Sequence, residues 1–302
     1  YYNSILMNIY DCFMYFDEDL LLDIRLNSLN KFVKKFVISE STYTHSGSKK
    51  KLNFNIDNFK KFKDKIIYIV VEDQPKNIKT LNENDSEEKK GEKLILNGMA
   101  RDYFQRENLI KGITDAKNDD LILISDLDEI PYLNNLNYSK INNQIIIFEQ
   151  KMFYYKLNLL YEDYNWLGTR GIKKKNLVSP QWLRNVKGRN YPKWRVDILF
   201  SKKKYSNILF IKNGGWHYTF LKTAEELEKK LLNFAHHYEY QESGLNIKKI
   251  KQFIDEKRVI YDHNVDQKQF KWSGKVKLKK IENNFLPEYI RSNLNKYKDW
   301  LD

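Results

Sequence analysis

The segment Asp120-Leu-Ile-Leu-Ile-Ser125 leads directly into Asp126-Leu-Asp-Glu-Ile-Pro131, and this junction decides the predicted fold. The apolar run before Ser125 is typical of a strand in a sheet that is covered on both faces. Side chains alternate along an extended segment, so Asp126 and Asp128 are expected on the same side of the strand's carboxyl end. Open α/β sheets bind their ligands at that edge. The junction therefore predicts an α/β fold with a ligand site at these two aspartates.

Strand and helix patterns alternate on both sides of the junction. Further strands are predicted at 9–16, 36–39, 65–71, 144–150, 152–157, 195–201 and 208–212. Helices are predicted at 17–30, 93–116, 224–237, 247–256 and 287–301, with an exposed loop at 82–93. Only helix patterns follow Trp216-His217. We therefore expect a main α/β domain at residues 1–220 and a helical C-terminal extension, residues 221–302, packed on it.

The composition excludes a disordered chain, because 41% of the 302 residues are hydrophobic and 15% are aromatic. Lys and Arg number 53 against 40 Asp and Glu, which gives a formal charge of +13. This excess favours an anionic partner, such as nucleic acid, phospholipid headgroups or a phosphorylated substrate. Charge alone does not choose among them.

Cys12 is the only cysteine, so the chain has no intrachain disulfide and no Cys-rich zinc site. A reducing compartment is the natural expectation. No stretch approaches the roughly 20 apolar residues that span a bilayer, and Asp11 interrupts the first apolar run. We expect a cytoplasmic protein with at most peripheral membrane contact.

The Asp126-Leu-Asp128 motif favours a divalent cation. Two carboxylates on one side suit Mn²⁺ or Mg²⁺, and such an ion would neutralise charge that builds on a leaving diphosphate. Glu129 adds a third carboxylate beside the pair, and clustered carboxylates repel one another unless a cation compensates them. The alternative is an acidic turn that caps a helix, since a lone Asp-x-Asp occurs often by chance.

A second motif, Gly214-Gly-Trp-His217, comes directly after a predicted strand. Paired glycines permit a close backbone approach or a positive φ, and an imidazole beside such a turn can complete a metal shell. His217 is therefore a third candidate ligand. The alternative is a buried structural histidine.

Polar residues also follow the strand at 36–39. Ser39, Glu40 and Thr42 lie where a base or ribose would be held, although an ordinary strand-to-loop turn would use the same residue types. On the long helix, Asp102 and Arg106 share one face, from which Arg106 could reach a phosphate. An exposed, ion-paired helix face is the alternative there.

Taken in order, these segments resemble glycosyltransferase family 17, whose best-known member adds the bisecting N-acetylglucosamine to N-glycans. The matching segments are Tyr10-Asp-Cys-Phe13, Glu18-Asp-Leu-Leu-Leu-Asp-Ile-Arg25, Phe36-Val-Ile-Ser-Glu-Ser-Thr-Tyr-Thr44, Tyr103-Phe-Gln-Arg106, Ser125-Asp-Leu-Asp-Glu-Ile-Pro131, Trp166-Leu-Gly-Thr169, Pro180-Gln-Trp-Leu-Arg184, Gly215-Trp-His217, His237-Tyr-Glu239 and Leu286-Pro-Glu-Tyr289.

The resemblance implies a GT-A type nucleotide-binding fold with a mixed central sheet and a helical C-terminal tail. It also implies a nucleotide-sugar donor, with UDP-GlcNAc as the default, a glycan acceptor, Mn²⁺ or Mg²⁺, and inversion at the anomeric carbon. Asp126 and Asp128 match the family's Asp-x-Asp, and His217 matches its Gly-Trp-His. Glu40 and Arg106 match positions expected near the nucleotide, and Asp126 is expected to contact the nucleotide as well.

Inversion by direct displacement needs a general base, normally a carboxylate. The candidates are Glu129, Asp163, Asp197 and Glu239, and the sequence does not rank them. Trp166, Thr169 and Arg170 are the candidates for acceptor binding. Trp182 and Trp194 could also stack on sugar faces, although large aromatic residues often belong to the core.

Two other functions remain open from the sequence. A metal-dependent nuclease or nucleotidyltransferase would also use clustered carboxylates and a basic surface. The chain carries no recognised nucleic-acid motif, so we expect no nucleic-acid partner. A catalytically inactive, carbohydrate-binding relative is the second alternative, although the Asp-x-Asp and Gly-Trp-His motifs argue against it.

Overall fold

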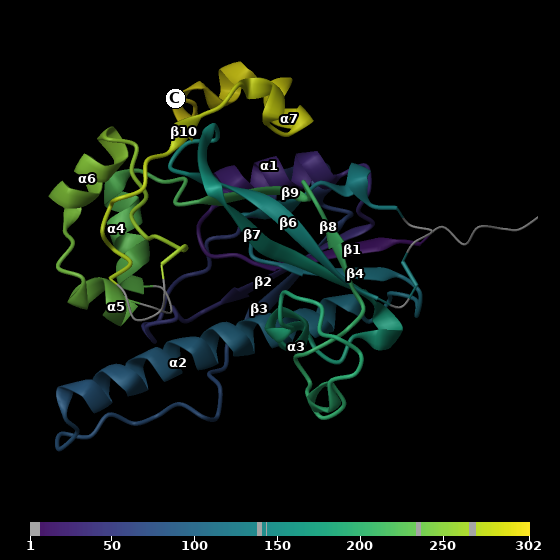
Figure 1. Cartoon of the computed structure of the whole chain (residues 1–302), viewed down its shortest axis with the longest axis horizontal. Coiled ribbons are helices and arrows are strands. Elements are labelled where there is room, and N and C mark those ends of the chain that lie inside the picture. The colour runs from purple at the N-terminus through teal and green to yellow at the C-terminus, as the bar shows by residue number, and fades with distance from the viewer. Residues whose placement is uncertain (1–6, 138–140, 143, 234–236, 266–269) are drawn as a thin grey trace, which may run out of the picture.

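A computed structural model describes residues 7–137, 141–142, 144–233, 237–265 and 270–302. Within these ranges ten strands form one sheet, with helices packed on both faces (Figure 1). The α/β class predicted from the sequence is confirmed, and the sheet is mixed. Every helix in the described ranges is too short or too polar to cross a lipid bilayer.

Four parallel strands form one half of the sheet, in the spatial order β3-β2-β1-β4. They are β1 (Ile9–Met14), β2 (Lys35–Ser41), β3 (Ile66–Val71) and β4 (Leu121–Ser125). Helix α1 (Asp19–Leu29) connects β1 to β2, and α2 (Glu87–Glu107) precedes β4 with a short 3₁₀ helix, η2 (Asn108–Ile113). These crossovers bring the carboxyl ends of β1 and β4 to one edge.

The other half of the sheet is mixed. Next to β4 the order continues β7-β6-β9-β5, while β10 pairs with β7 and β8 with β6. These strands are β5 (Glu129–Pro131), β6 (Ile145–Tyr154), β7 (Leu159–Lys173), β8 (Ile208–Ile211), β9 (Gly215–Thr219) and β10 (Lys279–Lys280). The β4–β7 pair is antiparallel, and it joins the two halves.

The remaining helical elements are short. The α-helices are α3 (Pro180–Asn185), α4 (Ala224–Asn233), α5 (His237–Glu242), α6 (Ile247–Asp255) and α7 (Glu288–Arg291). The 3₁₀ helices are η1 (Ile56–Phe62), η3 (Leu133–Asn135), η5 (Lys174–Asn176), η6 (Val196–Ile198), η7 (Asn283–Phe285) and η8 (Leu294–Trp300).

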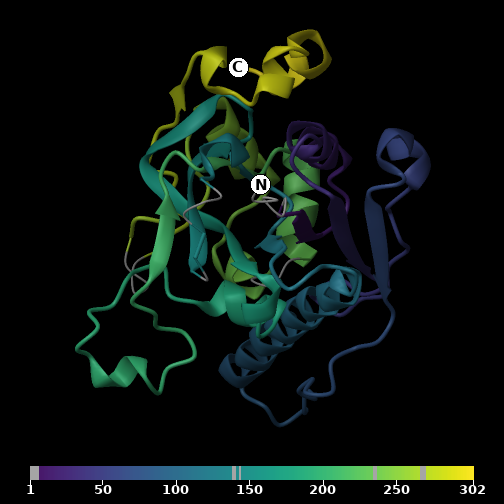
Figure 2. The ribbon, with the colours of Figure 1, turned by 90° about the vertical axis from the view of Figure 1, so that its right-hand side faces the viewer.

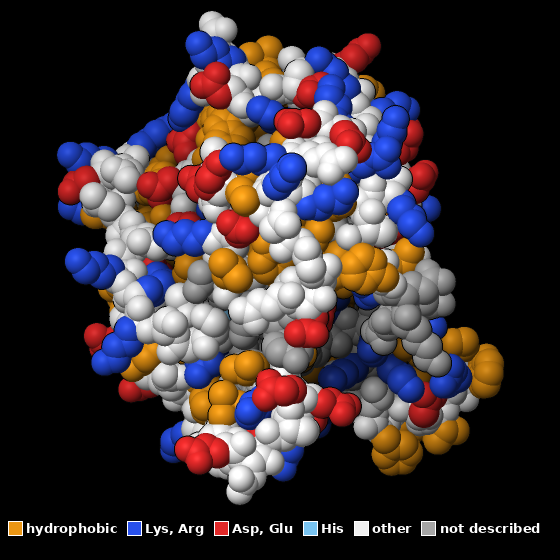
Figure 3. Space-filling view, turned by 90° about the vertical axis from the view of Figure 1, so that its left-hand side faces the viewer, with side chains coloured by type: hydrophobic (Ala, Val, Ile, Leu, Met, Phe, Trp, Pro, Cys, Tyr) orange, Lys and Arg blue, Asp and Glu red, His pale blue; other side chains and the backbone are white. Residues whose placement is uncertain are grey.

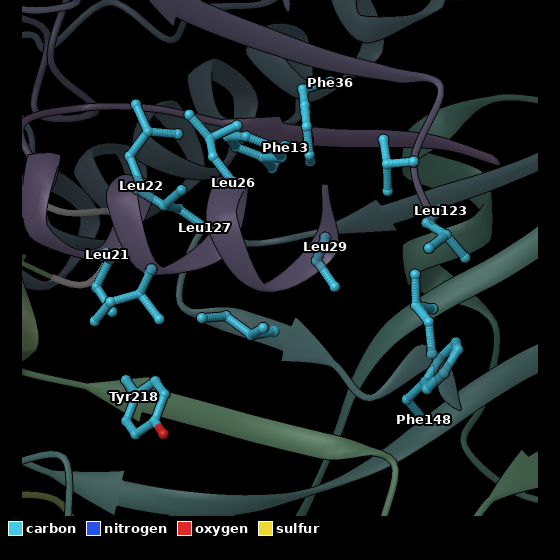
Figure 4. Packing of buried hydrophobic residues seen from close by; sticks show 14 of the residues in the cluster. Phe13, Leu21, Leu22, Leu26, Leu29, Phe36, Leu123, Leu127, Phe148 and Tyr218 are labelled. Carbon is cyan, nitrogen blue, oxygen red and sulfur yellow. The ribbon is translucent and has the colours of Figure 1, made fainter. Parts of the chain in front are cut away.

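Helices cover the sheet in two layers, with α1 and α7 on one face and α2 and α3 on the other (Figure 1). Leucines of α1 such as Leu22 and Leu26 pack close to Phe13 of β1 (Figure 4). The same hydrophobic cluster includes Ile290 and Tyr297 from the C-terminal segment. The C-terminal tail therefore completes the core of the α/β region, and the division of the chain at residue 220 stays a prediction.

Several predicted elements have different bounds or a different form. The strands predicted at 144–150 and 152–157 are largely one strand, β6, which is followed by the unpredicted β7. The segment 195–201 is not a strand, because its residues form local turn hydrogen bonds around η6, such as Leu199 N–H to Val196 C=O. The helix predicted at 287–301 is two elements, α7 and η8.

Helix α2 begins earlier and ends earlier than predicted. Ser86 accepts a hydrogen bond from the Lys89 N–H and caps a helix that runs through most of the predicted loop at 82–93. Past Glu107 the chain tightens into η2, where a Cβ on Gly112 would lie only 2.3 Å from Cγ1 of Val37. Of the helix predicted at 224–237, residues 234–236 lie outside the described residues.

The fully buried guanidinium of Arg25 links α1 to the segment after β4. It forms a two-pronged ion pair with Asp11 of β1, at 2.6 and 2.8 Å, and both side chains are fully shielded from solvent. Its Nη1 donates to the carbonyls of Asp126 (3.1 Å), Leu127 (3.1 Å) and Glu129 (2.7 Å). Arg25 therefore holds the backbone of the Asp-x-Asp turn from inside the core.

Replacing Arg25 by Met should lower the free energy of unfolding by about 3–5 kcal/mol, because Asp11 is then left buried and unpaired. Denaturation followed by circular dichroism measures this loss. Lys31→Met is a suitable control, since Lys31 pairs with Glu288 at 3.5 Å on the surface and such pairs contribute about 0–1 kcal/mol. Equal losses in both variants would contradict the role of Arg25.

Candidate active site

A cavity of about 610 Å³ lies at the carboxyl ends of β1 and β4. Asp126, Asp128 and His217 all line it, together with residues of α2 and of the C-terminal helices α4 and α5. The three residues predicted to hold a metal, although far apart in sequence, therefore share one cavity.

Pairing of β5 with β9 brings His217 to the Asp-x-Asp turn. Glu129 and His217 are directly opposed in this antiparallel pair, and the Tyr218 N–H donates to the Asp128 carbonyl at 2.9 Å. Nε2 of His217 lies 3.5 Å from Oδ1 of Asp128. The imidazole also stacks on Trp166, with ring centroids 4.7 Å apart. Stacking and the strand register thus orient the ring toward Asp128.

The two glycines before Trp216 are required by close backbone contacts, as the sequence predicted. Gly215 has φ of +130°, and a Cβ there would lie 2.1 Å from the carbonyl oxygen of Ile130. A Cβ on Gly214 would lie 2.5 Å from the carbonyl oxygen of Ile211. A side chain at Gly215 would push β9 away from β5, and one at Gly214 would clash with the end of β8 and with β6. Trp216 and His217 themselves lie within β9, not in a turn.

The carboxylate of Asp126 faces two arginines. It accepts hydrogen bonds from Arg106 at 3.1 Å and from Arg184 at 3.0 Å. Burial alone would raise the pKa of Asp126, but Arg184 and Arg106 outweigh it and hold the pKa well below its usual range. Asp126 is thus ionised and partly neutralised by protein groups.

Asp126 and Asp128 are not successive positions of an extended strand. The Glu129 N–H donates to the Asp126 carbonyl at 3.1 Å, so the segment between them is a turn. Asp126 therefore faces the arginines, while Asp128 faces His217. For His217, burial alone would lower the pKa, but the charge of Asp128 leads the groups that raise it above its ordinary value.

The Asp128 carboxylate and the His217 imidazole are suitable ligands for a divalent cation. The two groups converge in the cavity. Asp126 lines the same cavity, but both of its oxygens are engaged by arginines. No three His, Cys, Asp or Glu side chains stand in a metal-binding arrangement in the part of the chain that the structure describes.

Glu129 is fully buried, and its carboxylate forms hydrogen bonds with three other residues of the site. Its carboxylate accepts from Trp166 Nε1 (2.6 Å), from both terminal nitrogens of Arg184 (2.8 and 2.9 Å) and from the Asp126 N–H (3.0 Å). A carboxylate with four donors around it is placed to position its neighbours, not to accept a proton from an acceptor. Arg184 was not predicted as a site residue from the sequence.

On α2, Arg106 is buried and ion-paired with Asp102 at 2.8 Å, and it also donates to Gln181. Asp102 and Arg106 both line the cavity. The helix face that they share therefore points inward and is not exposed. Gln105, on the same face, donates to the Ser39 carbonyl at 2.9 Å.

The predicted nucleotide-binding residues at the end of β2 are used by the chain itself. Buried Glu40 accepts from Lys50, from the N–H groups of Asn53 (2.7 Å) and Phe54 (3.0 Å), and from Tyr68 (2.8 Å). The hydroxyls of Ser39 and Thr42 donate to backbone carbonyls. The cavity wall nearby is formed instead by Tyr43, Thr44 and His45.

Of the four carboxylates considered as general base, Glu239 of α5 lines the cavity, whereas Glu129, Asp163 and Asp197 do not. Asp163 is exposed. Asp197 pairs with Arg195 at 2.8 Å and with Lys204 at 2.6 Å, in the loop between α3 and β8.

Among the predicted acceptor-binding residues, Trp166 lines the cavity and the others are placed elsewhere. Thr169 is buried and donates to the Glu129 carbonyl at 3.0 Å. Arg170 donates to carbonyls at the end of α3, and burial lowers its pKa to about 10. Trp182 packs on Tyr205 with ring centroids 6.0 Å apart. Trp194 is 80% exposed in the loop between α3 and β8.

No sequence pattern pointed to several cavity residues from the C-terminal third. Lys230 of α4 pairs with Glu18 at 3.2 Å, and both line the cavity. His263 also lines it, 5.6 Å from Trp166, and burial followed by the charge of His217 lowers its pKa to about 4. His263 is therefore neutral near pH 7. Such residues reach the cavity through tertiary packing alone.

Comparison with known proteins tests the resemblance seen in the sequence. No curated protein matches the chain. The family model of glycosyltransferase family 17 matches residues 3–301, essentially from end to end. The Asp-x-Asp turn and the Gly-Trp-His strand, which carry the resemblance, meet in one cavity. On the match over residues 3–301, the chain belongs to glycosyltransferase family 17.

Proposed function

We propose that this glycosyltransferase is metal-dependent and inverting, and that it moves GlcNAc from UDP-GlcNAc to a hydroxyl group of a glycan acceptor. Family membership supports the nucleotide-sugar donor and the glycan acceptor. The observation that carries the proposal is the convergence of Asp128 and His217, 3.5 Å apart, beside Asp126 in a cavity of about 610 Å³. A cavity of this size suits a small-molecule ligand.

A GT-A type fold is part of the proposal. Support comes from the parallel order β3-β2-β1-β4, with the Asp-x-Asp turn directly after β4. The neighbouring antiparallel strand β7 carries Trp166 to the same cavity. We assign the donor to the carboxyl edge of the parallel strands, because open α/β sheets bind nucleotides there.

The proposed cation is Mn²⁺ or Mg²⁺, with Asp128 and His217 as its protein ligands. When bound, it would supply positive charge to stabilise the leaving nucleoside diphosphate. Asp126, whose carboxylate is held by Arg106 and Arg184, is assigned to the nucleotide side of the site. The arginines keep Asp126 ionised and fixed, so it can accept a hydrogen bond from a ribose hydroxyl.

Lys230 is the proposed partner of the diphosphate. Lys230 lines the cavity, and its pKa is raised because Glu18 and Asp128 outweigh the effect of burial. A charged ammonium in this position can bind phosphate oxygens. Arg106 lies in the same wall, but Asp102 and Asp126 already engage it.

Glu239 is the proposed general base. Among the four candidates weighed from the sequence, it is the carboxylate that reaches the cavity wall. Trp166 lines the same cavity, and its flat face suits the apolar face of a sugar ring. An acceptor hydroxyl bound there would transfer its proton to Glu239 as the glycosidic bond forms, while the bond from the sugar to the diphosphate breaks and the nucleoside diphosphate leaves.

Release of nucleotide from a panel of sugar nucleotides with Mn²⁺ tests the proposed activity. Asp128→Asn should lower the rate roughly 100-fold or more, because a charged ligand is lost. Asp119→Asn is the matched control, since Asp119 pairs with Lys173 and Lys175 on the surface. If no donor turns over with metal, or if both variants behave alike, the proposed activity is wrong.

Lys230→Met should raise the KM for the donor by a factor of roughly 10–100, because a hydrogen bond to a charged group contributes about 1.5–3 kcal/mol. Lys222→Met is the control, since Lys222 forms a similar ion pair with Asp17, at 2.7 Å, without lining the cavity. Initial rates at varied donor concentration measure the effect. A KM that is unchanged in Lys230→Met would remove this residue from the donor site.

Glu239→Gln should lower kcat for transfer by roughly 10²–10⁴-fold while the Kd for the donor stays the same, because a base acts in the chemical step. Transfer to a glycan acceptor and donor titration measure the two quantities. Glu242→Gln, on the exposed side of the same helix, is the control. Full transfer activity in Glu239→Gln would assign the base to another carboxylate.

A further inference from the structure

The loop between α3 and β8 projects from the body of the molecule (Figure 2, lower left). Its tip carries four large apolar side chains that are exposed to solvent: Trp194 (80%), Val196 (66%), Leu199 (81%) and Phe200 (85%). Four such residues within seven positions form an apolar patch of the kind that marks an interaction site. We call residues 187–205 the projecting loop.

The projecting loop is built by defined hydrogen bonds. At its base the Lys187 N–H donates to the Lys203 carbonyl at 2.7 Å, and the Tyr191 N–H donates to the Tyr205 carbonyl at 2.9 Å. At its tip, η6 is closed by the bond from the Leu199 N–H to the Val196 carbonyl. The exposure of the apolar side chains is thus a feature of the folded loop.

The projecting loop is also strongly basic. It contains seven Lys or Arg residues and one acidic residue, Asp197. Asp197 is itself paired with Arg195 and Lys204, which also lie over the ring of Tyr191 at 5.6 and 5.7 Å. In the space-filling view, hydrophobic side chains gather on a projection at the lower right, with basic side chains beside them (Figure 3).

We propose that the projecting loop docks on an anionic lipid bilayer and inserts its apolar tip into the headgroup boundary. Tryptophan favours this interface, and basic side chains next to an apolar tip add attraction to anionic headgroups. Nucleic acid would also attract the basic side chains and stack on Trp194 and Phe200, but the aliphatic Val196 and Leu199 between them suit acyl chains and offer no flat face to a base. The docking needs neither donor nor cation, so it is independent of the proposed function.

Flotation with lipid vesicles tests the proposal on the whole chain. The protein should bind vesicles of phosphatidylcholine with about a third phosphatidylserine, and bind neutral phosphatidylcholine vesicles much less. Replacing Trp194, Leu199 and Phe200 together by Ser should weaken binding roughly tenfold or more. Phe285→Ser, at a residue 64% exposed on another surface, is the control and should bind as the wild type does. Circular dichroism checks that both variants fold.

A second pair of variants tests the charge. Replacing Lys193, Lys202 and Lys203 by Gln should weaken binding to anionic vesicles. Replacing Lys60, Lys61 and Lys63 by Gln removes the same charge from an exposed segment around η1 and should leave binding unchanged. Equal losses in the two triple variants would show attraction by overall charge alone and would overturn the proposal.

Tryptophan fluorescence measures insertion directly. Lipids brominated in their acyl chains should quench the emission of the wild-type protein, whereas Trp194→Phe should still bind but lose most of that quenching. Failure of the wild-type protein to float with anionic vesicles, or equal binding by the tip variant, would reject the loop as a membrane contact. Stronger competition from soluble RNA than from free phosphate would also reject the membrane contact, because it would assign the basic side chains to nucleic acid.

Discussion

The buried ion pair of Arg25 with Asp11 is the constraint on which the rest of the site depends. A charged guanidinium inside a core is stable only if its donors are all satisfied, and Arg25 meets this condition with Asp11, Ser125 and three backbone carbonyls of the Asp-x-Asp turn. The turn therefore cannot move without leaving buried N–H donors of Arg25 without acceptors. Helix α1, strands β1 and β4, and the Asp-x-Asp turn are held together by one side chain.

Around this fixed turn, a second layer of buried charges sets the direction of each aspartate. Arg184 binds both Asp126 and Glu129, so the first acid of the motif is turned toward the arginines. Asp128 is left to face His217, which the β5–β9 register places opposite Glu129. The acidic cluster is compensated mainly by arginine, and the two donors without such compensation converge in the cavity.

The C-terminal third contributes to both the core and the cavity. Ile290 and Tyr297 complete the cluster that covers α1, while Lys230 and Glu239 line the cavity from helices that follow β9. Packing and site formation are thus coupled, since the helices that bury apolar surface also carry the polar groups. The projecting loop stands apart from this arrangement, with a fold that displays apolar side chains instead of burying them.

The sequence alone predicts the α/β class, the family and the Asp-x-Asp and Gly-Trp-His motifs, because unbroken apolar strands, paired glycines and clustered acids are local patterns. It did not predict the 15-residue strand β7, the form of segment 195–201 or the use of Glu40, Thr169 and Arg170 as internal supports. Strand β7 and these supports depend on partners elsewhere in the chain, whereas segment 195–201 takes its form from local turn hydrogen bonds. The tertiary structure is needed to show that Asp126 faces Arg106 and Arg184, which lie 20 and 58 residues away in the chain, and that Lys230 and His263 reach the cavity. Strand register and helix packing bring these groups together, and neither can be derived from a local pattern.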